Sequence, residues 1–362
     1  MINTNLPIAV AEGDKMRAAP IRRRAAAAVL CIALLAAGPA RAVDPAMVEA
    51  ARKEGIVVWY SGLIVNQVVR PVSDGFERKY PGIKVQGSRL TSSEAALKIM
   101  NEARAGRPQA DVFDGTALVF RLEAAGVVEH YKPEAAAAFP DGSKEPNGVW
   151  TAFNTYIMTP AVNTDTVAAK DIPKTLQDLL DPKWRGRMAW TNDPTTAGPP
   201  GFIGNVLAAM GQQAGMDYLR HLAQQRIVNV PAAQRVVLDQ VIGGQYALAL
   251  MTFNNHSVIS ANDGAPVRWL PIEPAVQLPN PGGLIRNAPH PNAAKLLLEY
   301  ILSPEGQAVF RDANYIPANP AVPPKDTTLT PTGGGFATTL ITPETTAAKL
   351  EGWVAIYNEL FK

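Results

Sequence analysis

Cysteine, histidine and aromatic side chains are scarce in this sequence. Cys31 is the single cysteine among 362 residues, which excludes an intramolecular disulfide and a cysteine-built metal site. The four histidines, at positions 130, 221, 256 and 290, lack the spacing of metal ligands, and no Gly-x-Ser-x-Gly or His-Glu-x-x-His motif is present. Aromatic residues make up only 7% of the chain, which argues against a sugar-binding cleft. The sequence therefore predicts a protein that is not an enzyme and that needs no metal or cofactor.

A large net charge is also absent once the first 42 residues are set aside. These residues hold a basic stretch, an apolar run at 25–37 and a small-x-small site at 40–42, a pattern typical of a secretory signal peptide cleaved after Ala42. They carry six basic and two acidic side chains of the whole chain's 34 and 32, which leaves 28 against 30 and a formal charge of −2. We therefore expect an exported protein that is released from the membrane and has no nucleic-acid partner.

Short apolar runs alternate with helical patterns along the rest of the chain. Residues 56–60 and 110–113 have the composition of strands buried on both faces. After the first of them, residues 65–79 have helical spacing and residues 83–86 are expected to form a second short strand. The order strand, helix, strand favours right-handed parallel crossovers and therefore an α/β fold. Residues 148–159 and the proline-rich segment 271–281 are expected to carry the chain from one lobe to another. Residues 317–324 and 331–335 are expected to be loops without a packing pattern.

Polar residues follow the predicted strands of the first part of the chain. Ser61 and Gly62 come after the first strand, and Asp114 and Thr116 after the strand at 110–113. Between them, the helix start at residues 91–94 supplies Ser92 and Ser93. The carboxyl ends of parallel strands share one edge of a sheet, so these groups are expected to gather at a ligand site. The alternative for residues 91 and 92 is that they only cap the helix.

The second part of the chain repeats this arrangement. A predicted strand at 186–191 leads into a helix through Thr195, Thr196 and Ala197, a turn rich in free N–H groups. The apolar run 246–251 is followed by Asn254 and Asn255. We interpret this pair as a polar strand tip facing the ligand, and the alternative is a surface turn that caps the next helix.

The motif Ser-Pro-Glu-Gly-Gln at 303–307, with residues 287–295 before it, resembles the extracellular solute-binding proteins of bacterial ABC importers. The resemblance extends to residues 54–60 and to the closing helix at 353–361, and it is strongest to the branch that includes the periplasmic ferric-ion-binding proteins. It implies a type 2 periplasmic binding fold: α/β, with two doubly wound lobes joined by crossing hinge strands. It also implies a periplasmic monomer, with a small-molecule ligand and a membrane complex of ABC permease and ATPase as partners. The implied division is a signal peptide at 1–42, lobe 1 at 43–155 plus 272–325, and lobe 2 at 156–271 plus 326–362.

The residues that bind iron in the ferric branch are not matched. That branch has tandem tyrosines where this chain has Asn254 and Asn255, and it has a histidine where this chain reads Leu-Ile-Val at 63–65. Fe³⁺ prefers anionic oxygen ligands, so two neutral amides are poor replacements.

Hydroxyls, amides and free N–H groups instead suit the oxygens of a carboxylate, phosphonate or phosphate ester. We therefore expect a small organic anion as ligand. Ferric iron, alone or as an iron–anion complex, and presentation of a ligand to a chemoreceptor stay open as alternatives. Arg235 is either a counter-ion or a solvated surface residue, and Tyr156 is either a wall of the site or strand core. The predicted ligand-binding residues are Ser61, Gly62, Ser92, Ser93, Asp114, Thr116, Tyr156, Thr195, Thr196, Ala197, Arg235, Asn254 and Asn255.

Overall fold

The computed structural model describes residues 43–362, and the predicted signal peptide with Cys31 lies outside the described residues. The strands are β1 (Ile56–Ser61), β2 (Lys84–Arg89), β3 (Val112–Asp114), β4 (Val128–Glu129), β5 (Thr151–Asn163), β6 (Met188–Thr191), β7 (Val228–Val230), β8 (Leu248–Phe253), β9 (Val267–Trp269), β10 (Ala275–Ile285), β11 (Ile316–Pro317) and β12 (Thr338–Leu340). The α-helices are α1 (Pro45–Glu54), α2 (Arg70–Lys79), α3 (Ser92–Arg104), α4 (Val119–Ala124), α5 (Pro199–Met210), α6 (Gln212–Ala223), α7 (Gln234–Ile242), α8 (Asn254–Asn262), α9 (Pro291–Leu302), α10 (Pro304–Asp312), α11 (Pro331–Gly334) and α12 (Pro343–Phe361). One π-helical turn, η1 (Val65–Val69), precedes α2, and the short 3₁₀ turns are η2 (Glu134–Ala136), η3 (Ala169–Asp171), η4 (Gln177–Leu180), η5 (Pro182–Trp184) and η6 (Thr327–Leu329).

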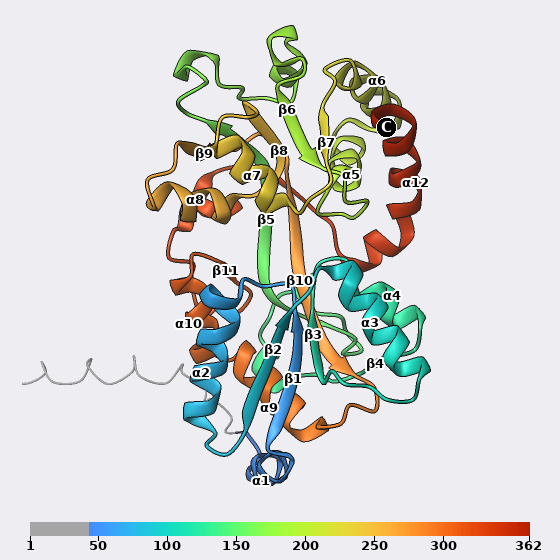
Figure 1. Ribbon diagram of the computed structural model, residues 1–362, viewed down its shortest axis with the longest axis vertical. Helices are drawn as coiled ribbons and strands as arrows, with labels where there is room; N and C mark the ends of the chain where they lie inside the picture. Colours follow the sequence, from blue (N-terminus) through green and yellow to red (C-terminus); the bar gives the residue numbers. More distant parts are fainter. Residues whose placement is uncertain (1–42) are drawn as a thin grey trace, which may run out of the picture. The chain divides into compact units, whose positions relative to one another are not determined.

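The strands form one mixed sheet with the order β2-β1-β3-β10-β5-β8-β6-β7. Strands β1, β2 and β3 pair in parallel, as do β6, β7 and β8, whereas β5 and β10 are antiparallel to each other and to their neighbours β8 and β3. Helices α2, α9 and α10 lie on one side of the first parallel group and α3 and α4 on the other (Figure 1). The prediction of two α/β lobes joined by crossing strands is confirmed.

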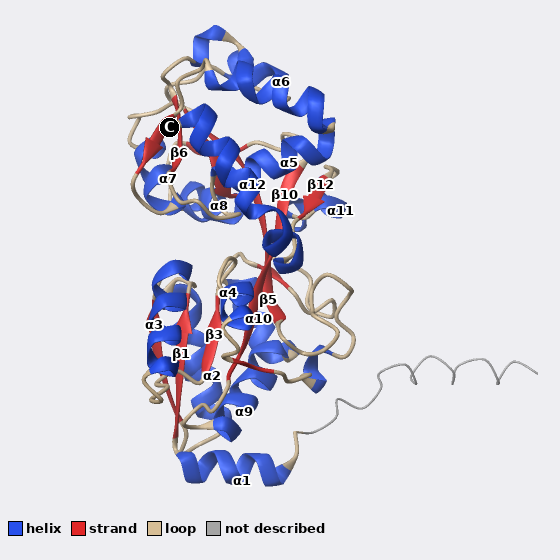
Figure 2. Cartoon of the chain, turned by 90° about the vertical axis from the view of Figure 1, so that its right-hand side faces the viewer, coloured by secondary structure: helices blue, strands red, loops and turns tan. Residues whose placement is uncertain are grey.

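The crossing strands β5 and β10 are the longest in the sheet, with 13 and 11 residues. They span the region between the two lobes in Figure 2. Residues 148–159 were expected to cross between the lobes, and β5 does so. The proline-rich return segment is itself a strand, because Pro279 and Pro281 are accommodated at an irregularity of the β5–β10 register between Asn280 and Pro281. The lobe boundaries at 155/156 and 271/272 stay predictions.

Local sequence signals explain several helix ends. Helix α1 ends where Gly55 adopts the left-handed conformation, with φ of 73°. Helix α3 begins with a capping box, in which the Thr91 hydroxyl accepts from the Glu94 N–H at 3.3 Å and the Glu94 carboxylate accepts from the Thr91 N–H at 2.8 Å. The interpretation of residue 91 as a helix cap is therefore confirmed.

The motif at residues 303–307 joins three parts of the first lobe. Ser303 caps α10 by accepting from the Gly306 N–H at 3.2 Å, and a Cβ on Gly306 would lie 2.1 Å from the Tyr300 carbonyl oxygen. The Gln307 side chain is completely buried and donates to the carbonyls of Phe153 and Ile301 at 2.8 and 2.9 Å. Its Oε1 accepts from the N–H groups of Ala318 and Asn319 at 2.8 and 3.1 Å. One amide thus ties α10 to the crossing strand β5 and to the chain after β11.

One expectation about the last part of the chain is wrong. Residues 331–335 are not an unpacked loop, because α11 and η6 form a small layer in which Leu329 and Phe336 are buried against Ile157 of β5. Helix α12 packs on α5 and α6 of the second lobe, but it also contacts α4 of the first, and the Trp150 indole N–H donates to Glu344 at its start at 2.8 Å. Among residues 43–362, no helix has both the length and the apolar character needed to cross a membrane.

We predict that Gln307→Leu lowers the free energy of unfolding by about 2–4 kcal/mol, because two carbonyls and two N–H groups lose their buried partner. Chemical denaturation measures this change. The matched control is Glu305→Gln, which removes the exposed ion pair with Lys79 and is expected to cost less than about 1 kcal/mol. Equal stability of the two variants would contradict the role given to Gln307.

Candidate functional site

A cleft with a cavity volume of about 700 Å³ lies at the carboxyl ends of the parallel strands of both lobes. The ends of β1, β2 and β3 and the first turn of α3 line one side. The loop after β6 and the starts of α7 and α8 line the other side, and β5 and β10 contribute Tyr156 and Asn280. The volume is within the range of small-molecule sites, and the position is the one expected for ligands of open α/β sheets.

Eight of the thirteen predicted binding residues line this cleft. They are Gly62, Ser92, Ser93, Thr116, Tyr156, Thr195, Ala197 and Arg235. Ser61, Asp114, Thr196, Asn254 and Asn255 do not line it, and all five are buried. The predicted strand ends therefore do meet at the cleft. The incorrect expectations concern which side chain at a strand end faces the cleft. A binding role for the eight residues stays a prediction.

Asn254 and Asn255 do not form a polar tip in the cleft, and they do not form a surface turn. Strand β8 ends at Phe253 and α8 begins at the next residue, so no loop separates them. The amides are therefore turned into the protein, where the Asn254 amide donates to the Leu329 carbonyl at 2.9 Å. Phe253 and His256 face the cleft instead.

Asp114 lies just below the cleft and organises its floor. Its carboxylate is 1% exposed and accepts hydrogen bonds from the Trp59 indole at 2.8 Å, from the Gly62 N–H at 3.3 Å and from the Asn280 amide at 3.2 Å. The Ser61 hydroxyl is a further partner. Burial raises the pKa of Asp114 to about 6, against which these hydrogen bonds act. Ser61 and Asp114 thus stabilise the turn at Gly62 in the cleft and are not placed to contact a ligand.

Two arginines face the cleft from opposite lobes. Arg235, on the first turn of α7, pairs with Asp239 at 2.9 Å and is one-third exposed. Arg89, the last residue of β2, is exposed and has no hydrogen-bond or ion-pair partner among residues 43–362. Arg89 was missed because the second strand was expected to end at residue 86. The strand-tip rule would have found it with the correct end.

His256 lies between these arginines and the protein interior. It is 6% exposed, and its pKa is lowered to about 3, first by burial and then by the positive charges of Arg235 and Arg89. The imidazole is therefore neutral at physiological pH and supplies a ring to the cleft without adding a charge.

Helix starts add positive potential to the same space. Helices α3, α7 and α8 each begin at the cleft, and no side chain caps α7 or α8. The first N–H groups of a helix and its macrodipole favour an anion. At α3, the carboxylate of Glu94 already occupies this position in the capping box.

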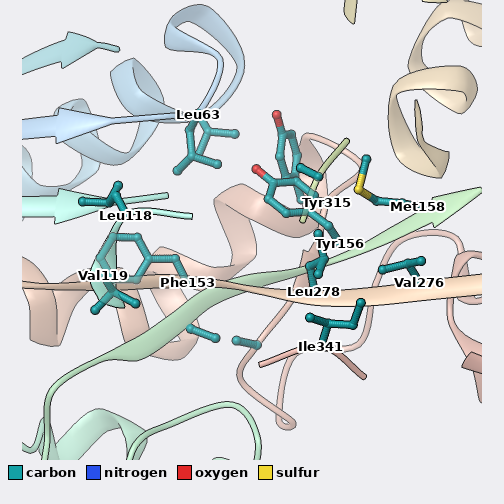
Figure 3. Close-up of a cluster of buried hydrophobic side chains, with 14 of the residues drawn as sticks. Leu63, Leu118, Val119, Phe153, Tyr156, Met158, Val276, Leu278, Tyr315 and Ile341 are labelled. Carbon is teal, nitrogen blue, oxygen red and sulfur yellow. The ribbon is translucent and has the colours of Figure 1, made fainter. Parts of the chain in front are cut away.

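Tyr156 of β5 and Tyr315, which precedes β11, come together in the cleft from distant parts of the chain, with ring centroids 6.0 Å apart. Figure 3 shows the two phenol rings next to each other near Leu63. Burial raises the pKa of both hydroxyls. No local sequence pattern marks Tyr315 as a site residue. Among residues 43–362, no group of three or more His, Cys, Asp or Glu side chains is placed to hold a metal ion.

A second cavity, of about 550 Å³, lies over η3, η4 and η5. Its Lys183 is 3.7 and 3.5 Å from the carboxylates of Asp171 and Asp181. Three lysines and three aspartates line this cavity, so their formal charges balance.

Known proteins share both sequence and fold with this chain. A family model described as bacterial extracellular solute-binding protein matches residues 107–333, which is more than half of the chain. An Fe(3+)-binding periplasmic protein of Serratia marcescens is 24% identical over 73% of this chain and 78% of its own length. A putative 2-aminoethylphosphonate-binding periplasmic protein of Salmonella paratyphi A is 23% identical over 60% and 65% of the two chains. The periplasmic binding protein AfuA of Actinobacillus pleuropneumoniae, solved with exogenous fructose-6-phosphate bound, superimposes with a TM-score of 0.72 at 21% identity, covering 85% of this chain and 98% of that chain.

We predict that Asp114 makes stability depend on pH. Its pKa is higher in the folded protein, about 6, than the ordinary value of 3.8, so its proton stabilises the fold at low pH and this contribution is lost as pH rises through about 6. The stability of the wild type relative to Asp114→Asn should therefore fall by about 2 kcal/mol between pH 4.5 and 7.5.

Denaturation of both proteins across this range measures the effect. His256 has the opposite pH dependence, which is common to both proteins and cancels in the difference. Asp263→Asn, at an exposed position, is the matched control. Parallel stability curves for wild type and Asp114→Asn would show that burial does not perturb this carboxyl group.

Proposed function

The chain belongs to the bacterial extracellular solute-binding proteins, and we propose that it captures a small organic anion in the cleft between its lobes. The anion is a carboxylate, phosphonate or phosphate ester, and the protein delivers it to the membrane permease of an ABC importer. The observation that carries this proposal is Arg89, an arginine that faces the cleft without a protein partner. A guanidinium binds the paired oxygens of these groups in a bidentate manner.

Two arginines and two acidic residues line the cleft, and Arg89 is the one of the four whose side chain has no hydrogen-bond or ion-pair partner among residues 43–362. Glu94 is engaged by Thr91, and Arg235 shares its charge with Asp239. Asp193, the other acidic residue of the cleft wall, has a hydrogen bond with the Thr195 side chain. Arg89 and the uncapped starts of α7 and α8 are therefore free to act on an anion.

Hydroxyl groups surround this positive region. Ser92, Ser93 and Thr116 come from the first lobe and Thr195 from the second, so one anion in the cleft would receive hydrogen bonds from both. The ligands named for two similar proteins, 2-aminoethylphosphonate and fructose-6-phosphate, are anions of this kind. Presentation of such an anion to a chemoreceptor would use the same cleft.

Ferric iron, alone or with an anion, is the second candidate. It is favoured by Tyr156 and Tyr315, whose phenol groups lie together in the cleft, and by the iron-binding relative. Against it, burial favours the neutral form of both phenols, whereas Fe³⁺ binds phenolates.

We predict that an organic anion raises the unfolding temperature of ligand-free protein and that neutral sugars do not. A micromolar ligand at millimolar concentration stabilises by roughly 4 kcal/mol. The panel contains dicarboxylates, phosphonates and sugar phosphates.

Arg89→Gln should weaken binding about 10- to 100-fold, because a charge-assisted hydrogen bond is lost. Arg107→Gln, exposed and outside the cleft wall, should bind as the wild type does. Absence of stabilisation by every anion would rule the proposal out.

The two candidates differ in their response to ferric citrate. If the ligand is an organic anion, ferric citrate stabilises the protein no more than citrate alone does. If it is iron, ferric citrate stabilises more, and Tyr315→Phe abolishes the difference because one phenolate ligand is lost. Thermal unfolding at matched citrate concentration decides between them.

A further inference from the structure

Four aromatic rings form a closed circuit in the wall of the cleft. Tyr156 contacts Phe253 with ring centroids 4.3 Å apart, and Phe253 contacts His256 at 5.1 Å. His256 contacts Tyr315 at 6.3 Å, and Tyr315 returns to Tyr156 at 6.0 Å. All four residues line the cleft, although aromatic residues are only 7% of the chain. We call this group the ring wall.

The ring wall is held in place by the surrounding structure. Tyr156, His256 and Tyr315 are 7%, 6% and 1% exposed, and Phe253 is the member that is partly exposed. Burial favours the neutral form of the phenol groups of Tyr156 and Tyr315. The wall therefore offers the cleft mainly apolar ring surface, with Phe253 as its accessible part.

The polar and apolar parts of the cleft are supplied by different elements. Arg89 ends β2, and Arg235 opens α7, whereas the ring wall comes from β5, the β8–α8 junction and the chain before β11. The neutral state of His256 keeps charge away from the rings. A compact anion that reached the arginines alone would leave the exposed face of Phe253 in contact with water.

We propose that the ligand is an aryl anion, whose flat aromatic body packs on Phe253 and the ring wall while its carboxylate or phosphate group binds Arg89. This inference rests on the proposed function and narrows it to one class of organic anion. Aromatic rings prefer offset or edge-to-face contact with one another, and burial of the ring adds to the affinity of the charged group.

Isothermal titration of ligand-free protein with paired probes tests the proposal. The probes are phenyl phosphate, cyclohexyl phosphate and methyl phosphate, together with benzoate and acetate. Phenyl phosphate is expected to bind about tenfold or more tightly than methyl phosphate, and more tightly than cyclohexyl phosphate. If the charged group is a carboxylate, the same preference appears for benzoate over acetate.

Variants at Phe253 connect this preference to the ring wall. Phe253→Leu keeps an apolar side chain but removes the ring, so it should abolish the preference for phenyl over cyclohexyl phosphate. Phe253→Tyr keeps the ring and should retain the preference. Phe120→Leu, in which a partly buried ring outside the cleft is changed, is the matched control. Thermal unfolding of each variant confirms that it is folded.

The outcomes separate this inference from the proposed function. If methyl and phenyl phosphate, and acetate and benzoate, bind equally and Arg89→Gln weakens all of them, the organic-anion function holds and the aryl class is wrong. Equal binding of cyclohexyl and phenyl phosphate, or an unchanged preference in Phe253→Leu, also overturns the aryl class. If no anion of either panel binds, both proposals fail.

Discussion

The pairing of β5 with β10 is the interaction on which the rest of the structure depends. These strands lie between the two parallel groups of strands in one sheet, and their pairing places Asn154 opposite Asn280 in register. The Asn280 amide donates to Asn154 at 3.0 Å and to Asp114 at 3.2 Å, so one buried side chain links the crossing strands to the tip of β3. Because buried polar groups must be satisfied, this network restricts how the strands and the cleft floor can be arranged.

The cleft combines two kinds of surface because different elements end there. Parallel strands direct their carboxyl ends and the following helix starts to one edge, which brings Arg89 and several N–H groups to the space between the lobes. The crossing strand β5 and the segment before β11 add rings instead. Asp114, whose carboxyl group has a raised pKa, is buried behind the cleft wall, whereas the two arginines face the cleft. The arrangement separates charge recognition from shape recognition.

The sequence predicted the strand tips well and their side-chain directions poorly. Gly62, Ser92, Ser93, Thr116 and Thr195 follow apolar strands or open helices, and all line the cleft as expected. Asn254 and Asn255 follow the same rule but are buried, because α8 begins directly after β8 and its helical geometry turns Phe253 and His256 to the cleft. The local sequence pattern identifies the end of a strand. The orientation of the helix that follows decides which residue at that end faces the cleft.

The sequence by itself determined most of the helices and strands and the family. The signals for them are apolar periodicity, the capping box at Thr91 and the Ser303–Gln307 motif, and each of these depends only on neighbouring residues. Gln307 is an intermediate case, because its type is visible in the motif but its four partners come from distant segments. Only the tertiary structure decided the composition of the cleft. Arg89, His256 and Tyr315 belong to segments that are unrelated in sequence, and they meet because β5 and β10 bring the two lobes together. A long-range contact of this kind leaves no periodic signal in a single chain.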